Sequence, residues 1–333
     1  MKYTSKVMML LVIFVLPFSC TPDENSPQPI IFATFTESKS DLSSICITVK
    51  SIRAFAGKYN NAPVWVYMPE TLMAQESETL EKLVALNVVV KTSEAPDTAT
   101  WFYFARKVFA AAQAEAEAEG HTAILAWLDP DTIFLLEPDE FILPKSTTLG
   151  YRPVMHKNIG LLYTEPLDEF WSRAYEKMNV DENTLFPMIT PADVDTIRPY
   201  FNAGCLIVKP HQSTLRKWAD YFTILYQDSV LAELCRQDIY KRIFIHQAAL
   251  TGAILNHVDR EKMLQLSDRI NYPIFFQEMF GAKRVFNDIT NVVTFRYESY
   301  FRNPVIDWYE QLNGPADRIE WMKKNLDKRF SIQ

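Results

Sequence analysis

An uninterrupted apolar segment that ends in two aspartates is the strongest constraint on the fold of this chain. Residues 124–128 read ILAWL without a polar residue, and Asp129 and Asp131 follow directly. A strand without polar alternation is typical of a sheet that helices cover on both faces. In such sheets, ligands bind beyond the carboxyl ends of the strands. The segment therefore predicts an α/β fold with a ligand site at the two aspartates.

Further apolar segments alternate with helical patterns before this segment. Strands are expected at 30–36, 63–68, 88–91 and 122–128, and helices at 41–59 and 101–119. This alternation predicts a mostly parallel central sheet with crossover helices on both faces. After Leu128 we expect more irregular structure and an aromatic-rich C-terminal extension. The rings of that extension either stack on sugars or, at helical spacing, cover the sheet.

Asp129 and Asp131 have the spacing and the chemistry of a divalent-cation site. Alternate residues of an extended backbone share a face, and Pro130 stiffens the bend between the two carboxylates. Hard oxygen ligands suit Mg²⁺ or Mn²⁺, and an ion with few protein ligands keeps positions for diphosphate oxygens. Asp-Pro-Asp is also ordinary turn chemistry, in which Asp131 and Thr132 cap a helical turn. Both interpretations stay open on these residues alone.

Several segments carry a family resemblance when they are taken in order. They are ILAWLDPDTIFLL around the two aspartates, a strand YFNAGCLIVKP at 200–210 with a helical pattern from Leu215, and a helix IHQAALTGAIL at 245–255. A strand, helix and strand at 30–67 precede them. Together they resemble nucleotide-diphospho-sugar transferases of the GT-A fold, especially the glycogenin-like and galactosyltransferase-like families. The likeness covers about residues 30 to 272. It implies a GT-A-like fold and transfer of a sugar from a nucleotide-diphosphate or other phosphorylated donor.

The resemblance also implies roles for matching residues. Asp129 and Asp131 match the pair that bridges Mn²⁺ or Mg²⁺ to the diphosphate of the donor. Asn202 and Gln247 match polar positions that line the sugar and acceptor side of the cleft, so they are the candidate catalytic residues. Arg106 lies roughly where the family often has a basic residue near the donor, and its alternative is a surface charge on a helix.

Two positions depart from the family pattern. His246 replaces the acidic residue that usually precedes the glutamine, so a carboxylate that would contact the transferring sugar is missing there. The expected strand at 291–296 reads NVVTFR and lacks the late histidine that commonly completes the metal site. It carries Arg296 instead, which either pairs with diphosphate oxygens as a donor-binding residue or ends the strand in solvent.

The N-terminus resembles a bacterial lipoprotein signal. Lys2 and Lys6 precede an apolar stretch at 7–18, and Cys20 follows within two residues of it. Such a stretch is short for a membrane span and is typical of a secretory signal. We therefore expect a signal peptide at 1–20 with lipidated Cys20, a tether at 21–29 and one transferase domain at 30–333. A plain N-terminal anchor is the alternative, and both place the domain in the cell envelope, with the outer membrane expected.

Composition limits the partners. A net charge of -7 and a pI near 5.4, without a dense basic segment, argue against nucleic acid. With 8 glycines the chain shows no glycine-rich phosphate loop. Cys46, Cys205 and Cys235 leave room for one disulfide in an oxidising compartment. The expected partners are a sugar donor, a glycan or protein acceptor and, through the lipid anchor, a membrane.

Three functions stay open at this stage. The first is a metal-assisted glycosyltransferase. The second is a non-catalytic surface lipoprotein that binds glycan or protein through a degenerate transferase cleft, which His246 and the missing late histidine favour. The third is a glycosidase that uses Glu137, Asp139 and Glu140, whose surroundings are those of a surface turn.

Overall fold

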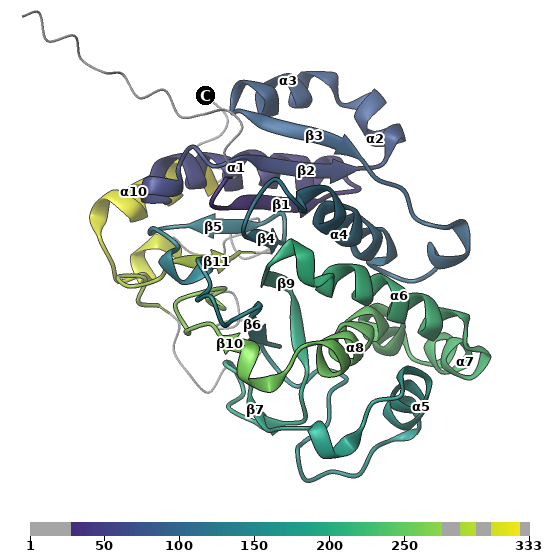
Figure 1. The fold of residues 1–333 in the computed structure, drawn as a ribbon. Coiled ribbons are helices and arrows are strands. Elements are labelled where there is room, and N and C mark those ends of the chain that lie inside the picture. Colours follow the sequence, from purple (N-terminus) through teal and green to yellow (C-terminus); the bar gives the residue numbers. More distant parts are fainter. Residues whose placement is uncertain (1–27, 275–286, 298–307, 327–333) are drawn as a thin grey trace, which may run out of the picture.

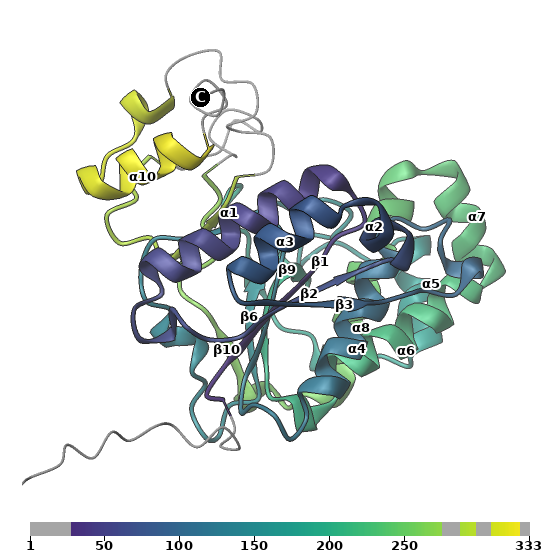
Figure 2. The same cartoon turned by 90° about the horizontal axis from the view of Figure 1, so that it is seen from above.

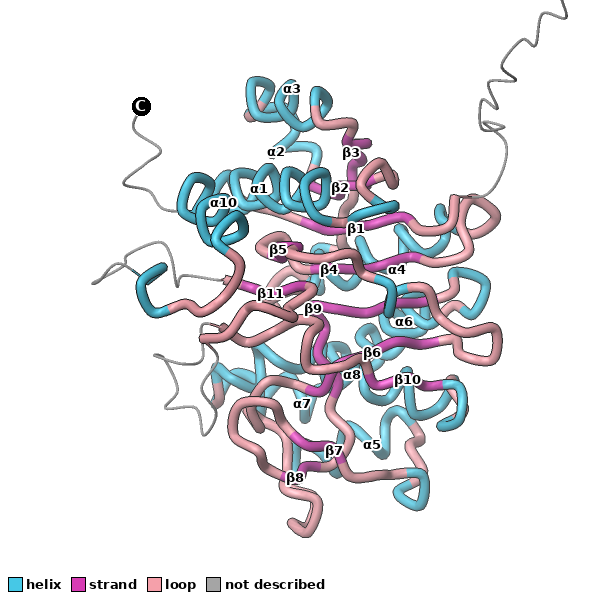
Figure 3. The backbone as a smooth tube through the Cα atoms, turned by 90° about the vertical axis from the view of Figure 1, so that its left-hand side faces the viewer, coloured by secondary structure: helices cyan, strands magenta, loops and turns pink. Residues whose placement is uncertain are grey.

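The centre of the protein is a seven-stranded sheet, seen in a computed structural model that describes residues 28–274, 287–297 and 308–326. The strands lie in the order β10-β6-β9-β4-β1-β2-β3, and Figure 3 shows them stacked in this order. Their bounds are β1 (Ile31–Phe35), β2 (Val64–Met68), β3 (Val88–Thr92), β4 (Leu125–Leu128), β6 (Leu149–Pro153), β9 (Phe201–Val208) and β10 (Met263–Gln265). Strand β9 runs antiparallel to β4 and β6, and the other neighbours are parallel. The predicted mostly parallel α/β sheet is confirmed.

Helices cover both faces of this sheet, as the apolar segment at β4 predicts. Leu125 and Trp127 point into a core shared with α4, α6 and α8, whereas Ala126 and Leu128 point into a core shared with α1 and α3. Figure 2 shows these two groups of helices on opposite sides of the strands. Their bounds are α1 (Lys39–Phe55), α3 (Ser77–Ala85), α4 (Ala105–Ala118), α6 (Thr214–Gln227) and α8 (Ile239–His257).

Several helices begin at a side chain that accepts a backbone N–H. Ser38 caps α1 in this way, and Asp168, Asp228 and Asp238 cap α5 (Glu169–Met178), α7 (Ser229–Gln237) and α8. Helix α2 (Glu70–Gln75) connects β2 with α3. The helices expected from Leu215 and at 245–255 are present as α6 and α8, whereas the expectation of irregular structure is wrong for α5 and α7. The helix expected at 101–119 begins later, since Phe104 has a left-handed backbone with φ of 60°.

Shorter elements complete the fold. β5 (Thr132–Phe134) pairs antiparallel with β11 (Thr294–Arg296), and β7 (Met188–Ile189) pairs with β8 (Thr196–Ile197). Figure 1 shows α10 (Ala316–Leu326) near β5 and β11, where a small third core forms. The 3-10 helices lie at 57–59, 97–99, 139–141, 182–184, 210–212, 260–262 and 308–311.

The aromatic C-terminal extension packs on the domain where it is described. The Trp321 ring on α10 meets the Phe55 ring on α1 edge to face, with centroids 5.4 Å apart. Packing therefore accounts for this ring, and it covers α1 and not the sheet directly. The stretch at 275–280, which is also rich in aromatic residues, lies outside the described residues.

The predicted lipoprotein signal cannot be compared with this structure. Cys20, the signal peptide and nearly all of the predicted tether lie outside the described residues. No described helix combines the length and the apolar character that a bilayer crossing requires. Among the described residues, Cys46, Cys205 and Cys235 form no disulfide, and burial of Cys205 and Cys235 agrees with packing as small apolar side chains.

Candidate active site

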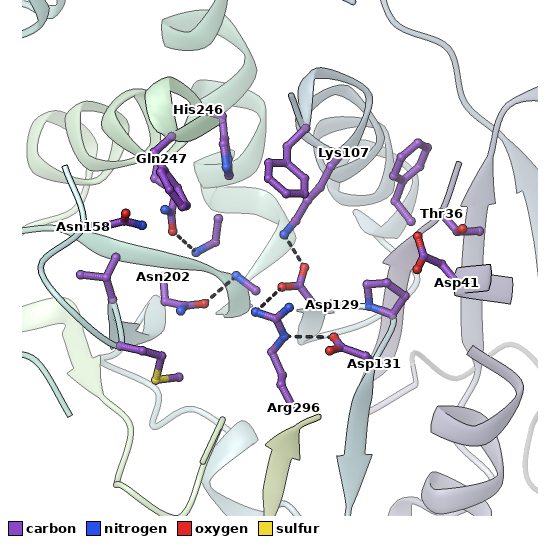
Figure 4. A pocket seen from close by; sticks show the side chains of 18 of the residues that line it. Thr36, Asp41, Lys107, Asp129, Asp131, Asn158, Asn202, His246, Gln247 and Arg296 are labelled. Carbon is purple, nitrogen blue, oxygen red and sulfur yellow. Dashed lines mark hydrogen bonds and ion pairs between the residues drawn. The ribbon is translucent and has the colours of Figure 1, made fainter. Parts of the chain in front are cut away.

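A cavity of about 600 Å³ opens at the carboxyl end of β4 (Figure 4). Its walls come from the start of α1, from α4, from the turn between β4 and β5, from β9, from α8 and from β11. The charged and polar residues that the argument uses are Lys107, Asp129, Asp131, Asn202, His246, Gln247 and Arg296. The sheet edge predicted to bind a ligand thus holds a cavity large enough for a small molecule.

The two aspartates lie in a tight turn that other elements hold in place. Thr132 donates its hydroxyl to the carbonyl oxygen of Asp129 at 2.8 Å, and its backbone N–H reaches the same oxygen at 3.2 Å. Thr48 on α1 donates its hydroxyl to the carbonyl oxygen of Pro130 at 2.8 Å. The turn leads directly into β5. The alternative in which Asp131 and Thr132 cap a helical turn is therefore wrong.

Two basic side chains contact the aspartates. Lys107 on α4 donates from Nζ to Oδ1 of Asp129. Arg296 on β11 bridges both carboxylates, with Nη1 2.9 Å from Oδ2 of Asp129 and Nε 3.0 Å from Oδ1 of Asp131. Figure 4 shows this chain of ion pairs at the floor of the cavity. Arg296 does end β11, but the alternative in which it is solvated is wrong, because its guanidinium contacts both aspartates inside the site.

Burial makes these contacts strong. The side chains of Asp129 and Asp131 are 9% and 8% exposed, and those of Lys107 and Arg296 are 11% and 19% exposed. Burial opposes the charge of Asp129, but the nearby positive charges of Arg296 and Lys107 outweigh it and hold its pKa below the usual value. Asp129 is therefore ionised at neutral pH.

Lys107 is the site residue that the sequence interpretation missed. The buried residues of α4 include a series at the helical repeat, formed by Lys107, Ala111, Ala114 and Ala118. These positions are separated by three or four residues, so they lie on one side of a helix. A lysine at the first position of an alanine-lined face is a signal that could have been read from the sequence.

Arg106, the neighbour of Lys107, points elsewhere. It pairs with Glu94 at 3.3 Å and with Glu37 at 3.5 Å, and its side chain is 31% exposed. It lines a second hollow at the rim, beside the exposed rings of Trp101 and Tyr103. The structure does not bring Arg106 to the aspartates, and its donor-binding role stays a prediction.

Asn202 and Gln247 line the cavity, and their amide oxygens bind the backbone of β9. Oδ1 of Asn202 accepts from the N–H of Gly204 at 2.8 Å, and Oε1 of Gln247 accepts from the N–H of Ala203 at 3.3 Å. The amide of Gln247 also donates to the Tyr200 hydroxyl at 3.3 Å. Both side chains thus shape the strand that faces the turn. Their catalytic role stays a prediction.

His246 lies in the wall between α8 and α4. Its ring centroid is 5.0 Å from that of Phe104 and 5.8 Å from that of Trp218, and Nδ1 is buried without a hydrogen-bond partner among the described residues. Burial lowers the pKa of His246 well below its usual 6.5, the charge of Lys107 lowers it further, and Asp129 opposes both. The imidazole is therefore neutral at pH 7. A neutral imidazole can donate or accept a hydrogen bond with a sugar hydroxyl, but it does not supply the negative charge of the acidic residue that it replaces.

The carboxylates of Asp129 and Asp131 are ligands of the kind that hard divalent cations prefer. Their contacts in the structure, however, are not those of a site that holds a bound ion. Each contacts a side-chain cation, and the described part of the chain contains no group of three or more His, Cys, Asp or Glu that could hold a metal ion. A divalent ion would have to displace Lys107 and Arg296 from the oxygens it needs. The side chains as they lie do not fit a resident divalent ion.

Comparison with known families identifies the class of protein. Residues 38–257 match the family model described as the Rhodobacterales glycosyltransferase domain, which is more than half of the 333-residue chain. The chain belongs to this family. The match includes Lys107, Asp129, Asp131 and the cavity residues on β9 and α8, whereas Arg296 lies beyond its end. Membership of the Rhodobacterales glycosyltransferase family confirms the predicted glycosyltransferase class, and the domain bounds of 30–333 stay a prediction.

Solved structures similar to this family member are also glycosyltransferases by name. Mouse xyloside xylosyltransferase 1 in its apo form is 11% identical, with a TM-score of 0.45 and coverage of 80% of this chain and 97% of that one. The galactosyltransferase LgtC with donor and acceptor sugar analogues is 16% identical, with a TM-score of 0.47 and coverage of 90% and 96%. Core-mannan synthase A from Aspergillus fumigatus, in an Mn/GDP form, is 9% identical, with a TM-score of 0.46 and coverage of 73% and 74%. Comparison with curated proteins gave no match.

Proposed function

We propose that this protein transfers a sugar from a nucleotide-diphosphate or other phosphorylated donor to a glycan or protein acceptor. The observation that carries the proposal is the set of Lys107, Arg296, Asp129 and Asp131 at the floor of a cavity in a glycosyltransferase domain. Transfer leaves negative charge on the departing diphosphate, and positive groups fixed beside it stabilise that charge. The positive charge comes either from a divalent ion on the carboxylates or from the two basic side chains.

The remaining cavity residues suit the sugar and the acceptor. Asn202 binds a backbone N–H within β9, Gln247 links α8 to β9, and the neutral His246 offers a hydrogen bond to a hydroxyl. At the rim, Trp101 and Tyr103 are exposed and the Arg242 guanidinium lies 4.9 Å from each of their ring centroids, and this aromatic and cationic surface suits contact with a sugar. We therefore propose that the acceptor enters past this rim.

A turnover assay tests the proposal. Full-length protein is incubated with a panel of UDP-sugars and GDP-sugars, and the UDP or GDP released is measured with and without acceptor glycans. We expect release from at least one donor, and loss of that release in Asp129→Asn. The matched control is Asp228→Asn, which alters another aspartate paired with basic side chains, far along the chain at the start of α7. Absence of both release and nucleotide binding would contradict the proposal.

Non-catalytic glycan binding is the second candidate, and one observation favours it. The amide oxygens of the two predicted catalytic residues, Asn202 and Gln247, are engaged with the backbone of β9. Oligosaccharide binding by calorimetry in EDTA, together with no binding of UDP or GDP, would support this second candidate over the first.

We also propose that the protein is anchored in the cell envelope through lipidated Cys20, at the outer membrane. The sequence pattern at 2–20 supports this placement. Nucleotide sugars are made in the cytoplasm, so an anchored enzyme would need a lipid-linked or other phosphorylated donor. Cell fractionation tests the anchor: wild type should pellet with membranes and incorporate a labelled fatty acid, and Cys20→Ser should do neither.

A further inference from the structure

We propose that Lys107 and Arg296 take the place of a divalent cation, so that the diphosphate of the donor is bound by side-chain charges alone. This inference rests on the proposed function, because it concerns the same phosphorylated donor. It assigns the diphosphate to two residues on different elements, α4 and β11, that meet at the turn between β4 and β5.

The charge count supports the assignment. Two aspartates and one divalent ion sum to zero net charge, and two aspartates with one lysine and one arginine also sum to zero. Among the described residues, Lys107 and Arg296 therefore already bring to the two aspartates the positive charge that a metal would bring. A divalent ion placed on the aspartates before a donor is bound would lie beside two cations that contact the same carboxylates, and repulsion between like charges disfavours this.

The geometry supports it as well. Arg296 bridges the two carboxylates at 2.9 and 3.0 Å, as an ion shared by an Asp-x-Asp pair would. A guanidinium is planar and carries five N–H groups, so it can contact carboxylate and phosphate oxygens together. Lys107 contacts the other oxygen of Asp129, and its ammonium group carries three protons on the cavity floor.

In this arrangement Asp129 and Asp131 are positioning residues. Lysine and arginine side chains lose conformational entropy when a ligand fixes them, and a partner that fixes them beforehand reduces this loss. The turn that carries the aspartates is itself fixed by Thr48 and Thr132. The cations are thus oriented before the donor arrives, which is the condition for strong electrostatic stabilisation of a leaving group.

Calorimetry on the full-length wild type tests the inference. Inorganic pyrophosphate and UDP are titrated in EDTA and again in excess Mn²⁺. We expect affinities that agree within about twofold in the two conditions. Binding that requires Mn²⁺ would overturn the inference and leave the proposed function intact. No binding of either probe in either condition would overturn both, so the two failures are distinguishable.

Single-residue variants test which basic side chains bind pyrophosphate. Lys107→Met and Arg296→Met should each lower pyrophosphate affinity by at least about tenfold, and Mn²⁺ should not restore it. Lys107→Arg keeps the charge and should bind within a few-fold of wild type. The matched control is Arg173→Met, which removes a cation from the buried Asp228 at a different helix start and should leave affinity unchanged. Full affinity in Lys107→Met and Arg296→Met would overturn the inference.

Metal binding is measured directly as a second readout. Electron paramagnetic resonance of Mn²⁺ mixed with wild type should show the signal of the free ion. A stoichiometric loss of that signal would mean that wild type holds the metal, and it would overturn the inference. This measurement and the EDTA comparison use wild-type protein, so they decide the question even where a variant does not fold.

Discussion

Gly204 lies so close to Asp129 that a β-carbon at position 204 would fall 2.8 Å from Cγ of the aspartate and closer still to Oδ2. The same oxygen contacts Arg296, and the backbone N–H of Asp129 donates to the carbonyl of Gly204 at 2.9 Å. A glycine on β9 is therefore what allows the carboxylate to lie against the strand.

Gly204→Ala should displace the Asp129 carboxylate and weaken its contacts with Lys107 and Arg296. We expect a stability loss of about 1–3 kcal/mol, as for other overpacked sites, together with a marked loss of pyrophosphate affinity. The control is Gly120→Ala, where φ is +82° and nothing lies within 4 Å, so the change strains the backbone away from the cavity. Both variants should lose stability in urea denaturation, but calorimetry should show lost affinity for Gly204→Ala alone. Normal affinity in that variant would contradict the prediction.

The pair of Lys107 and Asp129 should show strong energetic coupling. Lys107→Met removes one cation from a buried carboxylate, so we expect a stability loss of about 3 kcal/mol, at the lower end for buried pairs because Arg296 still contacts Asp129. In the double variant, Asp129→Asn also removes the carboxylate charge that Lys107→Met leaves without its lysine. The double variant should therefore be more stable than the sum of the single losses predicts, by about 1–3 kcal/mol in a urea-denaturation cycle. Additive losses would show that the two groups do not interact.

Glu115 should make stability fall as the pH rises from about 4.5 to about 7. Burial raises its pKa from the usual 4.5 to about 7, outweighing hydrogen bonds from Arg216 and Leu215, and Oε1 is buried without a partner among the described residues. In this window the folded state holds a proton that the unfolded state has released, so rising pH favours unfolding. Glu115→Gln should show a smaller fall over the same pH range. Identical pH profiles of unfolding free energy for the two proteins would rule out the shift.

His246 should remain neutral at pH 6.5, where a histidine with the usual pKa is half protonated. Its lowered pKa means that the unfolded state binds the proton first as pH falls below 6.5, so this residue reduces stability on the acid side. Nuclear magnetic resonance of imidazole-labelled protein reports the protonation directly, with free imidazole in the same tube as a reference. A midpoint for His246 near 6.5 would show that burial and Lys107 do not act as described.

The fold was predictable where the sequence pattern is local. The apolar stretch at β4 has alternating residues in two separate cores, as a strand covered on both faces requires. The direction of β9 was not predictable, because a continuous apolar strand looks the same in a parallel and an antiparallel pair. Of the four helices at 169–257, α6 and α8 lie where the family resemblance places helical segments, and α5 and α7 were missed although an aspartate caps each of them.

The site was predictable to a smaller extent. Asp129 and Asp131 follow from their place after an apolar strand, and the cavity lies there. The contact between Asp131 and Arg296 does not follow from spacing, because Arg296 is 165 residues away and reaches it through the pairing of β5 with β11. The family resemblance, in contrast, pointed to Arg296 as the residue in the strand that usually completes the metal site. Arg106 was chosen over Lys107 although one step along a helix turns a side chain by about 100°, which separates the rim from the floor of the cavity.

Because Arg296 lies on β11, late in the chain, it is synthesised after the other described residues that contact the two aspartates. The family match ends at residue 257, and the ribosome has produced everything inside it before Arg296 exists. Until then Asp131 lacks the guanidinium that it contacts in the finished protein, and long-range strand pairing is slow to form. A nascent chain or a truncated product can therefore contain the matched domain and still lack a competent site. The contacts at the floor of the cavity are therefore complete only after β11 has been synthesised and has paired with β5.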